Sequence, residues 1–419
     1  MRIGFVTPEF VTERYFSGGL ANYVYRIARA LVSKGHEVHV ITFSEEEPAE
    51  FNYKGIGVCR INNNRKTIAK LNRLTFGKLP SSIKLVALSW EFYIKLKELH
   101  RRHPFDLVQY SNYNSGGLVS SLLLDVPFML RISTYTPVWH DCLGVKRTPD
   151  MRTVEWMERL QLRVSRNIYA PSTTLKRMLE EQTSARNIRV VRTPFFIETE
   201  SWDNALYAKE LQCKPYLLFF GRYQLHKGIH ILAQALPQFF KNNDGCSAVF
   251  VGLDIATPLA PSMQNYISEI CSEYADRLHF IGQIPHEQLY PIINGARLVV
   301  LPSLIDNLPN ACLEAMALGK PVVGTRGASF DEMIRDGETG FLVPAGDAPA
   351  LADKLCEAWN EPRLDEIGRA AAAAVQAYAP EATVQTFLDY GQGIISRLRT
   401  GKPARRSRAE KLSARKQSI

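Results

Sequence analysis

The chain has 419 residues, enough for two domains, and 46% of them are hydrophobic, as in an ordinary globular protein. No stretch approaches the roughly 20 apolar residues that a membrane-spanning helix needs, and the N-terminus lacks a signal-peptide layout, so we expect a cytoplasmic protein. The seven cysteines form no CxxC pair, which argues against a zinc site or a disulfide framework.

The net charge of +9 is concentrated in two parts of the sequence. Residues 397–419 hold nine Lys and Arg and one Glu, a net charge of +8, so the rest of the chain is close to neutral. The tail 400–419 has no apolar period, which predicts a disordered basic arm that either meets an anionic surface or stays solvated. Residues 60–103 form a second basic stretch, which either contacts a membrane or an acidic acceptor or is simply solvated. We expect no nucleic-acid partner, because that role would rest on the tail alone.

Strand-like and helix-like segments alternate along the chain, which predicts an α/β fold of parallel sheets with helices on both faces. The predicted strands of the first half are short buried runs at residues 2–7, 37–43, 107–111, 127–133 and 167–171. Those of the second half lie at residues 216–221, 247–252, 278–282, 297–302 and 321–325. Amphipathic helices are predicted between the strands, for example at residues 20–34, 229–241 and 351–359.

The alternation stops over residues 193–213 and starts again near residue 214, which indicates a linker between two domains. We predict a first domain at residues 1–197 and a second at residues 198–379. A helix at about 380–399 is a candidate to cross back onto the first domain. Two α/β halves of similar size, joined in this way, form a cleft between them.

The first candidate ligand site follows the first predicted strand. Gly18 and Gly19 end the loop after that strand and precede the helix 20–34. Two glycines let a ligand approach the backbone closely, and a helix start favours an anion. The alternative is a tight turn without a ligand. Neither GxGxxG nor GxxxxGK[ST] occurs in the sequence, so the standard dinucleotide and phosphate-loop motifs are absent.

A second candidate site opens the second domain. Arg222 and Lys227 lie five positions apart on the turn between a predicted strand and a predicted helix. A planar guanidinium and a compact ammonium together suit a diphosphate. The alternative is a pair of solvated turn cations.

The third and most informative segment is PSLIDNLPNACLEAMALGKP, residues 302–321. It places two carboxylates, Asp306 and Glu314, eight positions apart across a loop-to-helix junction. Asn310 is predicted to cap the helix 311–318, and Gly319 is suited to its left-handed end. Because this loop follows a predicted strand, it lies at the carboxyl end of the sheet, where ligands bind in open α/β folds.

Taken together, these motifs resemble those of retaining glycosyltransferases of family 4, also called glycosyl transferases group 1. The resemblance covers nearly the whole chain, and the segments GRYQLHKG, HFIGQI and PSLIDNLPNACLEAMALGKPVVGT come in the family's order. It implies a GT-B architecture, in which two Rossmann-like doubly wound domains face each other across a cleft. It also implies transfer of a sugar from a nucleotide diphosphate sugar to an acceptor hydroxyl with retained configuration, in the synthesis of a surface polysaccharide, lipopolysaccharide or glycolipid.

The resemblance also implies roles for single residues. Arg222 and Lys227 would neutralise the diphosphate, Glu314 would bind the ribose hydroxyls, and Asp306 would contact the donor sugar near the reacting carbon. Other donor-binding residues would be the glycines that close over the diphosphate, the segment beside the base and the loop that offers its N–H groups: Gly18, Gly19, Gly282, Gln283, Ile284, Asn307, Leu308, Pro309 and Asn310.

Two positions depart from the family pattern. The first acid is usually Glu and here is Asp306, which is one methylene shorter. The family often has a histidine where this chain has Ser133, and the nearest histidine, His140, follows seven residues later. Either Ser133 or Thr134 makes the polar contact to the donor sugar, or His140 folds back into the cleft; a structural His140 is the alternative that we favour. The candidate catalytic residues are therefore Asp306, Arg222, Lys227, Ser133 and His140, and the substitution at 133 leaves an inactive homologue open.

No acidic DxD-like cluster follows a predicted strand, so no cofactor or obligatory metal is expected. Two other functions remain compatible with the motifs: a nucleotide-sugar epimerase of the same fold, and a non-catalytic nucleotide-sugar-binding subunit. The expected acceptor is a saccharide or a lipid-linked saccharide. The basic stretch and tail suggest a protein at the inner face of an anionic membrane.

Overall fold

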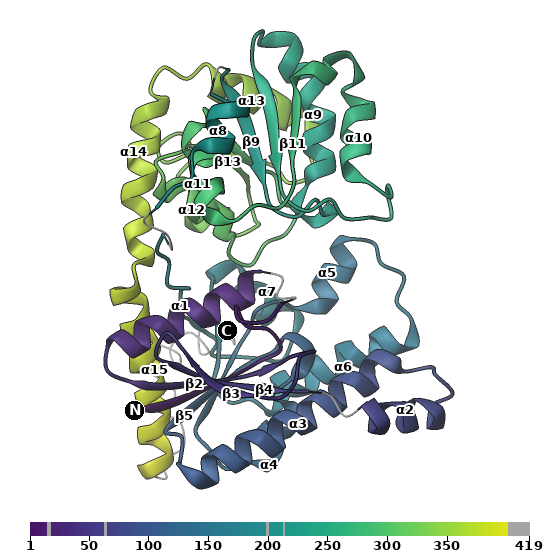
Figure 1. Ribbon diagram of the computed structural model, residues 1–419, viewed down its shortest axis with the longest axis vertical. Helices are drawn as coiled ribbons and strands as arrows, with labels where there is room; N and C mark the ends of the chain where they lie inside the picture. Colours follow the sequence, from purple (N-terminus) through teal and green to yellow (C-terminus); the bar gives the residue numbers. More distant parts are fainter. Residues whose placement is uncertain (15–17, 63–64, 198–200, 213, 401–419) are drawn as a thin grey trace, which may run out of the picture.

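The computed structural model describes residues 1–14, 18–62, 65–197, 201–212 and 214–400, which form two α/β domains (Figure 1). The tail beyond residue 400, predicted to be a disordered arm, lies outside the described residues. No helix in the part of the chain that the structure describes is both long and apolar enough to cross a membrane.

The first domain is built on an eight-stranded sheet with the strand order β3-β4-β2-β1-β5-β6-β7-β8. All neighbouring strands are parallel except β3 and β4, which pair antiparallel at one edge. The strands are β1 Arg2–Thr7, β2 Glu37–Phe43, β3 Glu50–Tyr53, β4 Ile56–Ile61, β5 Leu107–Ser111, β6 Phe128–Arg131, β7 Ile168–Ala170 and β8 Arg189–Val190. The helices are α1 Gly19–Ser33, α2 Arg65–Leu74, α3 Pro80–Arg102, α4 Leu118–Leu123, α5 Thr136–Cys142, α6 Pro149–Val164 and α7 Thr173–Gln182.

The second domain has a six-stranded, fully parallel sheet with the order β11-β10-β9-β12-β13-β14. Its strands are β9 Tyr216–Phe220, β10 Ser247–Val251, β11 Leu278–Ile281, β12 Leu298–Leu301, β13 Val322–Thr325 and β14 Phe341–Val343. Its helices are α8 Ala205–Glu210, α9 Ile229–Asn242, α10 Met263–Ile270, α11 His286–Gly295, α12 Asn310–Ala317, α13 Ala348–Trp359 and α14 Leu364–Val375. In both sheets the strand order reverses beside the first strand, and such switch points are where doubly wound folds bind ligands.

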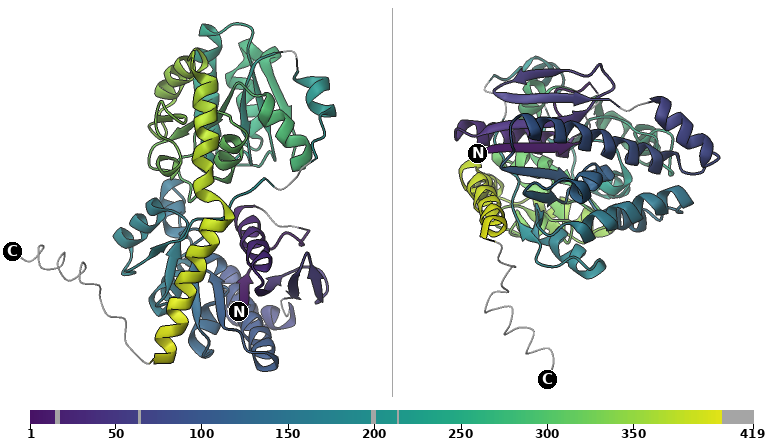
Figure 2. Two further views of the ribbon diagram at one scale, coloured as in Figure 1. Left: turned by 90° about the vertical axis from the view of Figure 1, so that its left-hand side faces the viewer. Right: turned by 90° about the horizontal axis from the view of Figure 1, so that it is seen from below.

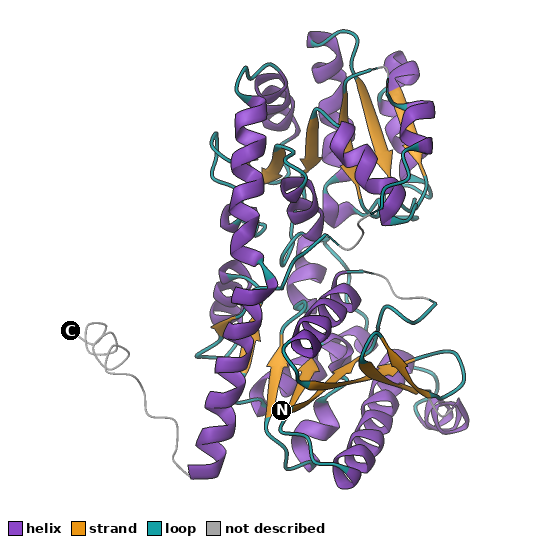
Figure 3. Ribbon diagram, turned by 60° about the vertical axis from the view of Figure 1, so that its left-hand side comes forward, coloured by secondary structure: helices purple, strands orange, loops and turns teal. Residues whose placement is uncertain are grey.

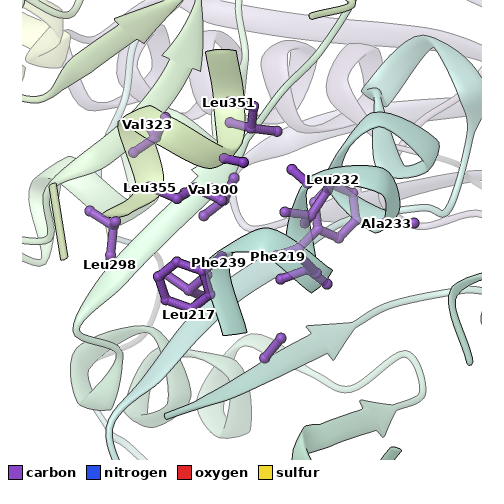
Figure 4. Packing of buried hydrophobic residues seen from close by; sticks show 14 of the residues in the cluster. Leu217, Phe219, Leu232, Ala233, Phe239, Leu298, Val300, Val323, Leu351 and Leu355 are labelled. Carbon is purple, nitrogen blue, oxygen red and sulfur yellow. The ribbon is translucent and has the colours of Figure 1, made fainter. Parts of the chain in front are cut away.

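The strands are buried because helices cover both faces of each sheet (Figure 3). All five residues of β9 are buried, which explains why its sequence YLLFF does not alternate between apolar and polar residues. In the second domain Leu217 and Val300 of the sheet pack under Leu232 of α9 and Leu351 of α13, and each is at most 2% exposed (Figure 4). The packing of helices on both faces fixes the position of the sheet, and therefore also the position of the loops at its carboxyl edge.

The C-terminal helix α15, Pro380–Thr400, returns to the first domain after the second domain is complete (Figure 2). Its Phe387 ring stacks on Phe5 of β1 at 6.0 Å between centroids, and its Tyr390 hydroxyl donates to the carbonyl of Ile168 at 3.3 Å. At Gly391 a Cβ atom would lie only 2.5 Å from Leu107 Cδ2, so a glycine permits the close approach of the helix to the sheet. The first domain therefore includes residues from both ends of the described chain.

The α/β fold with two parallel sheets, expected from the alternating pattern, is confirmed. The ten predicted strands are present, but the pattern did not reveal β3, β4, β8 and β14. It also left α8 inside the segment 193–213 that was predicted to be a linker without regular structure. β3, β8 and β14 have two to four residues and carry little periodicity, whereas β4 has six and was missed despite its length.

Candidate active site

A cleft of about 420 Å³ lies between the two domains, and residues of both domains line it. The first domain contributes the start of α1, the end of β6 and the segment that leads into α5. The second domain contributes the turn after β9 and the loop between β12 and α12. The residues that line it are Glu9, Gly19, Leu20, Tyr113, Arg131, Ser133, Thr134, Thr136, Trp139, Pro171, Thr193, Arg222, Gln224, His226, Lys227, Asp306, Asn307, Leu308 and Asn310.

The turn that carries Arg222 and Lys227 is locked against the loop after β12. Gly228 has φ 69°, and a Cβ atom there would lie 1.8 Å from the carbonyl oxygen of Pro302, so only glycine fits. The backbone N–H of Leu304 donates to the carbonyl of His226 at 2.8 Å. These contacts fix the position of the turn relative to the acidic loop.

The same arrangement pairs Lys227 with Asp306. The Lys227 Nζ atom donates to Asp306 Oδ2 at 2.5 Å, and Asp306 is only 8% exposed. The two charges neutralise each other at the wall of the cleft, while Arg222 is exposed beside them. A compact ammonium and a planar guanidinium thus face one space, which suits a group with several anionic oxygens.

His226 joins the two domains through its ring, which meets the ring of Trp139 edge to face at 4.5 Å between centroids. Burial, together with the charges of Lys227 and Arg222, lowers the pKa of His226 to about 3. The imidazole is therefore neutral at physiological pH and acts as a packing surface rather than as a third cation.

Two helix N-termini face each other across the domain boundary. Gly18 precedes α1 with φ 135°, and a Cβ atom placed there would lie 3.9 Å from Arg222 Nη2. A Cβ atom on Gly19 would lie 3.5 Å from Asn310 Nδ2 at the start of α12. Asn310 is the first residue of α12 rather than its cap; Pro309 holds the cap position and no side chain caps the helix. The predicted side-chain cap by Asn310 is therefore wrong, because its amide points toward α1 and not back to its own helix.

Ser133 lines the first-domain wall of the cleft, and two backbone contacts hold it there. Its backbone N–H donates to Asn112 Oδ1 at 2.7 Å, and its carbonyl accepts from the Asn307 side chain of the second domain. The Asn112 amide in turn donates to Glu158 Oε1, and Glu158 Oε2 accepts from the backbone N–H of Thr136 at 3.1 Å. Burial raises the pKa of Glu158 to about 7. A buried carboxyl group thus holds the loop that faces the second domain.

His140 does not reach the cleft. Its Nδ1 lies 2.7 Å from Glu155 Oε1, and Arg147 Nε donates to the same oxygen at 2.6 Å. The structure therefore places His140 in an ion-pair network of the first domain, whereas its neighbour Trp139 lines the cleft. Of the alternatives for the missing family histidine, Ser133 and Thr134 are the ones that face the cleft.

Glu314 lies in α12 and is 5% exposed. Its Oε1 is 3.7 Å from Nη2 of Arg26, a fully buried residue of α1, and 3.8 Å from Nε2 of His286. The carboxylate thus lies between the Arg26 guanidinium of the first domain and the His286 ring of the second, just outside the cleft.

The structure gathers the following predicted residues around one cleft: Gly19, Ser133, Arg222, Lys227, Asp306, Asn307, Leu308 and Asn310. The remaining predicted residues are not among those that line it: Gly18, His140, Gly282, Gln283, Ile284, Pro309 and Glu314. Sequence reasoning missed Arg131, Trp139 and Thr193 as parts of the cleft, because no local motif distinguishes them. It also missed His226, which lies inside the segment GRYQLHKG between the two cations that were identified. The described residues contain no group of three or more His, Cys, Asp or Glu that could hold a metal ion.

Comparison with known proteins finds relatives of both domains. Residues 17–198 match the family model described as Glycosyltransferase Family 4, and residues 214–361 match the model described as Glycosyl transferases group 1. A D-inositol 3-phosphate glycosyltransferase of Acidothermus cellulolyticus is 24% identical over 399 residues, which cover 92% of this chain and 87% of the relative.

Solved structures share the fold over nearly the whole chain. A sucrose-phosphate synthase from Thermosynechococcus elongatus has a TM-score of 0.73 and 20% identity, and the match covers 94% of this chain and 99% of that one. HepE from Anabaena, solved in complex with UDP and glucose, has a TM-score of 0.68 and 18% identity, with 94% and 100% coverage. At these identities the structures establish a common architecture.

Proposed function

Because the chain belongs to the family 4 glycosyltransferases of group 1 and has their GT-B architecture, we propose that it transfers a sugar from a nucleotide diphosphate sugar to an acceptor hydroxyl with retained configuration. The observation that carries this proposal is the meeting of Arg222, Lys227 and the starts of α1 and α12 at one cleft. Cations and helix N-termini together favour a diphosphate. The complex of HepE with UDP and glucose supports the choice of donor class.

In the proposed reaction the chain stabilises the leaving diphosphate. The bond between the anomeric carbon and the phosphate oxygen breaks, and the acceptor oxygen forms its bond to that carbon on the same face. The acceptor proton passes to the departing phosphate oxygen, so no protein base is required. Arg222 and Lys227 stabilise the negative charge that develops on the phosphate, a type of contact worth several kcal/mol in a dry site. Asp306 orients the Lys227 ammonium through their 2.5 Å contact.

Ser133 and Thr134 form the opposite wall and are proposed to contact the donor sugar. Their backbone is fixed by Asn112 and tied to the second domain by Asn307, so closure of the domains would bring sugar and diphosphate contacts together. Glu314 is proposed to bind the ribose beside the cleft, where Arg26 and His286 hold its carboxylate.

The test begins with a thermal-shift screen of nucleotide diphosphate sugars against the purified protein. The donor that stabilises it is then incubated with candidate acceptors, and mass spectrometry detects the product while NMR gives its anomeric configuration. The double variant R222A/K227A should lose both donor stabilisation and transfer, whereas Lys241→Ala, at the far end of α9, should keep them. Normal activity of the double variant would overturn the assignment, as would conversion of the donor to an epimer without any acceptor.

We further propose that the acceptor is a saccharide attached to a lipid and that the first domain approaches an anionic membrane. Val86, Trp90 and Ile94 follow one another at four-residue spacing on α3 and are 47%, 47% and 46% exposed, so they form one apolar face. Residues 65–103 hold ten Lys and Arg but two acids. An exposed apolar face among cations fits the interface of an anionic bilayer.

Vesicle sedimentation tests this contact. The chain should bind vesicles that contain phosphatidylglycerol and not vesicles of phosphatidylcholine alone. Trp90→Glu should weaken this binding by tenfold or more, because a charge replaces an apolar side chain that would enter the bilayer. Leu259→Glu is the matched control, since Leu259 is also 47% exposed but belongs to the second domain. Equal binding of both variants would refute this face as the contact.

A further inference from the structure

Arg131 is a buried cation at the wall of the cleft that the donor contacts described above do not use. It is the last residue of β6, is 5% exposed, and lines the cleft on the first-domain side. Arginine stays protonated in proteins, so its charge persists in this site. A charge so buried requires either a counter-ion or a ligand that supplies one.

No carboxylate of the described residues lies within ion-pair distance of Arg131. Its Nη1 donates to Ser133 Oγ at 2.7 Å and its Nη2 to Thr193 Oγ1 at 3.3 Å, and both acceptors are neutral hydroxyls. The guanidinium carbon lies 3.7 Å from the centre of the Tyr23 ring. Its buried Nε has no hydrogen-bond partner. Hydroxyls and a ring face hold the group in place without neutralising it.

The polar groups behind Arg131 are neutral as well. Tyr23 and Tyr169 donate to Gln109 Oε1 at 2.7 and 2.5 Å, and all three side chains are buried. Burial raises the pKa of Tyr23 to about 12 and that of Tyr169 well above its usual value of 10, so neither phenol becomes the missing anion.

The two acids that line the cleft do not serve as the partner either. Asp306 is paired with Lys227 at 2.5 Å. The ionisable groups that act on Arg131 are Tyr23 and Tyr169, and Glu9 is not among them. The first-domain wall therefore presents an uncompensated positive charge to the cleft.

We propose that Arg131 is the centre of a second anion subsite, which binds a phosphate or carboxylate group of the acceptor. The hydroxyls of Thr136 and Thr193 line the same cleft and can donate to the anion's oxygens. The inference rests on the proposed function for the identity of the ligand as an acceptor. The donor diphosphate has its own cations on the second domain, so Arg131 is left for an anion that enters from the first-domain side.

The first test measures binding of inorganic phosphate and of methyl phosphate by thermal shift. Both should stabilise the wild type and also R222A/K227A, in which the donor cations are absent. Arg131→Gln in the R222A/K227A background should lower the phosphate affinity by about tenfold or more, as expected for a lost charge-assisted contact. Arg192→Gln, an exposed neighbour outside the cleft, should leave it unchanged. If R222A/K227A abolishes the phosphate effect, or Arg131→Gln does not change it, the subsite is refuted.

The second test separates the acceptor from the donor. With the donor that supports transfer, a phosphorylated or carboxylated acceptor should have a higher kcat/KM than its uncharged analogue, and Arg131→Gln should remove that preference while the donor KM changes less than twofold. An increase in the donor KM of tenfold or more, with the preference retained, would instead assign Arg131 to the donor diphosphate and overturn the proposal.

Two further variants keep a positive charge at position 131, so they distinguish the loss of the subsite from a folding defect. Arg131→Lys retains a point charge and should retain part of the phosphate affinity, and Thr193→Val removes one oxygen that orients the guanidinium and should weaken phosphate binding by a few-fold. Unchanged phosphate binding in Thr193→Val together with full loss in Arg131→Lys would contradict the geometry. Failure of the proposed function has a different signature, namely that no nucleotide diphosphate sugar stabilises the wild type while phosphate still does.

Discussion

At the scale of single residues, the function depends on which charges at the cleft are already paired. Asp306 neutralises Lys227, whereas no acid among the described residues forms an ion pair with Arg131, which contacts two hydroxyls. Just outside the cleft, Glu314 meets Arg26 across the domain boundary. Asp306 replaces the Glu that the family usually has, and its short side chain holds the ammonium at 2.5 Å. This pair places the Lys227 ammonium where the diphosphate is proposed to leave.

Replacement of Lys227 by Ala should lower kcat more than it raises the KM for the donor. The ammonium is proposed to act on charge that develops as the phosphate departs, and loss of one such contact typically costs about 10²- to 10³-fold in kcat. Steady-state kinetics at saturating acceptor measure both parameters, with Lys241→Ala as the control. A rise in KM at constant kcat would mean that Lys227 contributes to ground-state binding alone.

Glu158 should make stability depend on pH. Its pKa is about 7 in the folded chain, raised by burial from an ordinary 4.5, so the unfolded chain loses this proton first as the pH rises. The unfolded state then binds fewer protons, and stability falls from about pH 4.5 through pH 7. Relative to Glu158→Gln, the wild type should lose about 2 kcal/mol of unfolding free energy between pH 5 and pH 8, from the 1.4 kcal/mol that one pKa unit represents.

Urea unfolding of both proteins at the two pH values measures this difference, and Glu338→Gln, an exposed residue of the second domain, provides the control. If the difference in unfolding free energy between the wild type and Glu158→Gln is the same at pH 5 and pH 8, the pKa of Glu158 is not raised in the folded chain.

Single residues also show what the sequence can and cannot predict. Arg222, Lys227 and Asp306 were identified because they stand in short motifs at strand ends, where the fold brings them together. Arg131 and Trp139 could not be identified in this way, because their importance comes from burial and from contacts with residues distant in the sequence. The sequence left open whether His140 enters the cleft, because contacts with Glu155 and Arg147 determine its position.

At the scale of elements, the tight passage from β9 to α9 determines the geometry of the second-domain wall. The sequence shows a glycine, Gly228, directly after the two cations of this turn. The structure explains why a glycine stands there, because Gly228 lies against the Pro302 carbonyl at the end of β12. The predicted helices and strands that carry the site were found because they are long or fully buried. The edge strand β14 was missed although β7, which is equally short and equally buried, was predicted, so length alone does not explain the difference.

Gly228→Ala should destabilise the protein more than Gly245→Ala. The two glycines have φ of 69° and 70°, so both substitutions carry the cost of a left-handed alanine, about 1 kcal/mol. A Cβ atom at Gly228 also meets the Pro302 oxygen at 1.8 Å, whereas one at Gly245 meets nothing within 4 Å. The difference between the two variants should therefore be about 2 kcal/mol or more in unfolding free energy. Equal losses would mean that the turn can move away from β12 without cost.

At the scale of the whole molecule, the two domains are joined by specific polar contacts in addition to the crossing chain. The first two backbone N–H groups of α7, those of Thr173 and Thr174, donate to the Glu332 carboxylate of the second domain at 2.9 and 2.7 Å. Beside them the hydroxyls of Ser172 and Ser329 are 3.2 Å apart. A carboxylate from one domain thus caps a helix of the other. Glu332 lies 158 to 159 residues from these N–H groups, so the sequence gives no local sign of the contact.

Glu332→Ala should therefore favour a more open arrangement of the domains. Loss of a helix-capping carboxylate costs about 1 kcal/mol, which shifts an equilibrium between closed and open forms by about fivefold toward the open one. Small-angle X-ray scattering should detect a larger radius of gyration for the variant, and a bound donor should reduce it again by bridging the two walls of the cleft. Glu338→Ala, whose carboxylate pairs with Arg335 inside the second domain, is the matched control and should leave the radius unchanged. If the two variants have the same radius of gyration, the contact at α7 does not hold the domains together. The crossing helices α14 and α15 and the contacts at the cleft would then hold them without it.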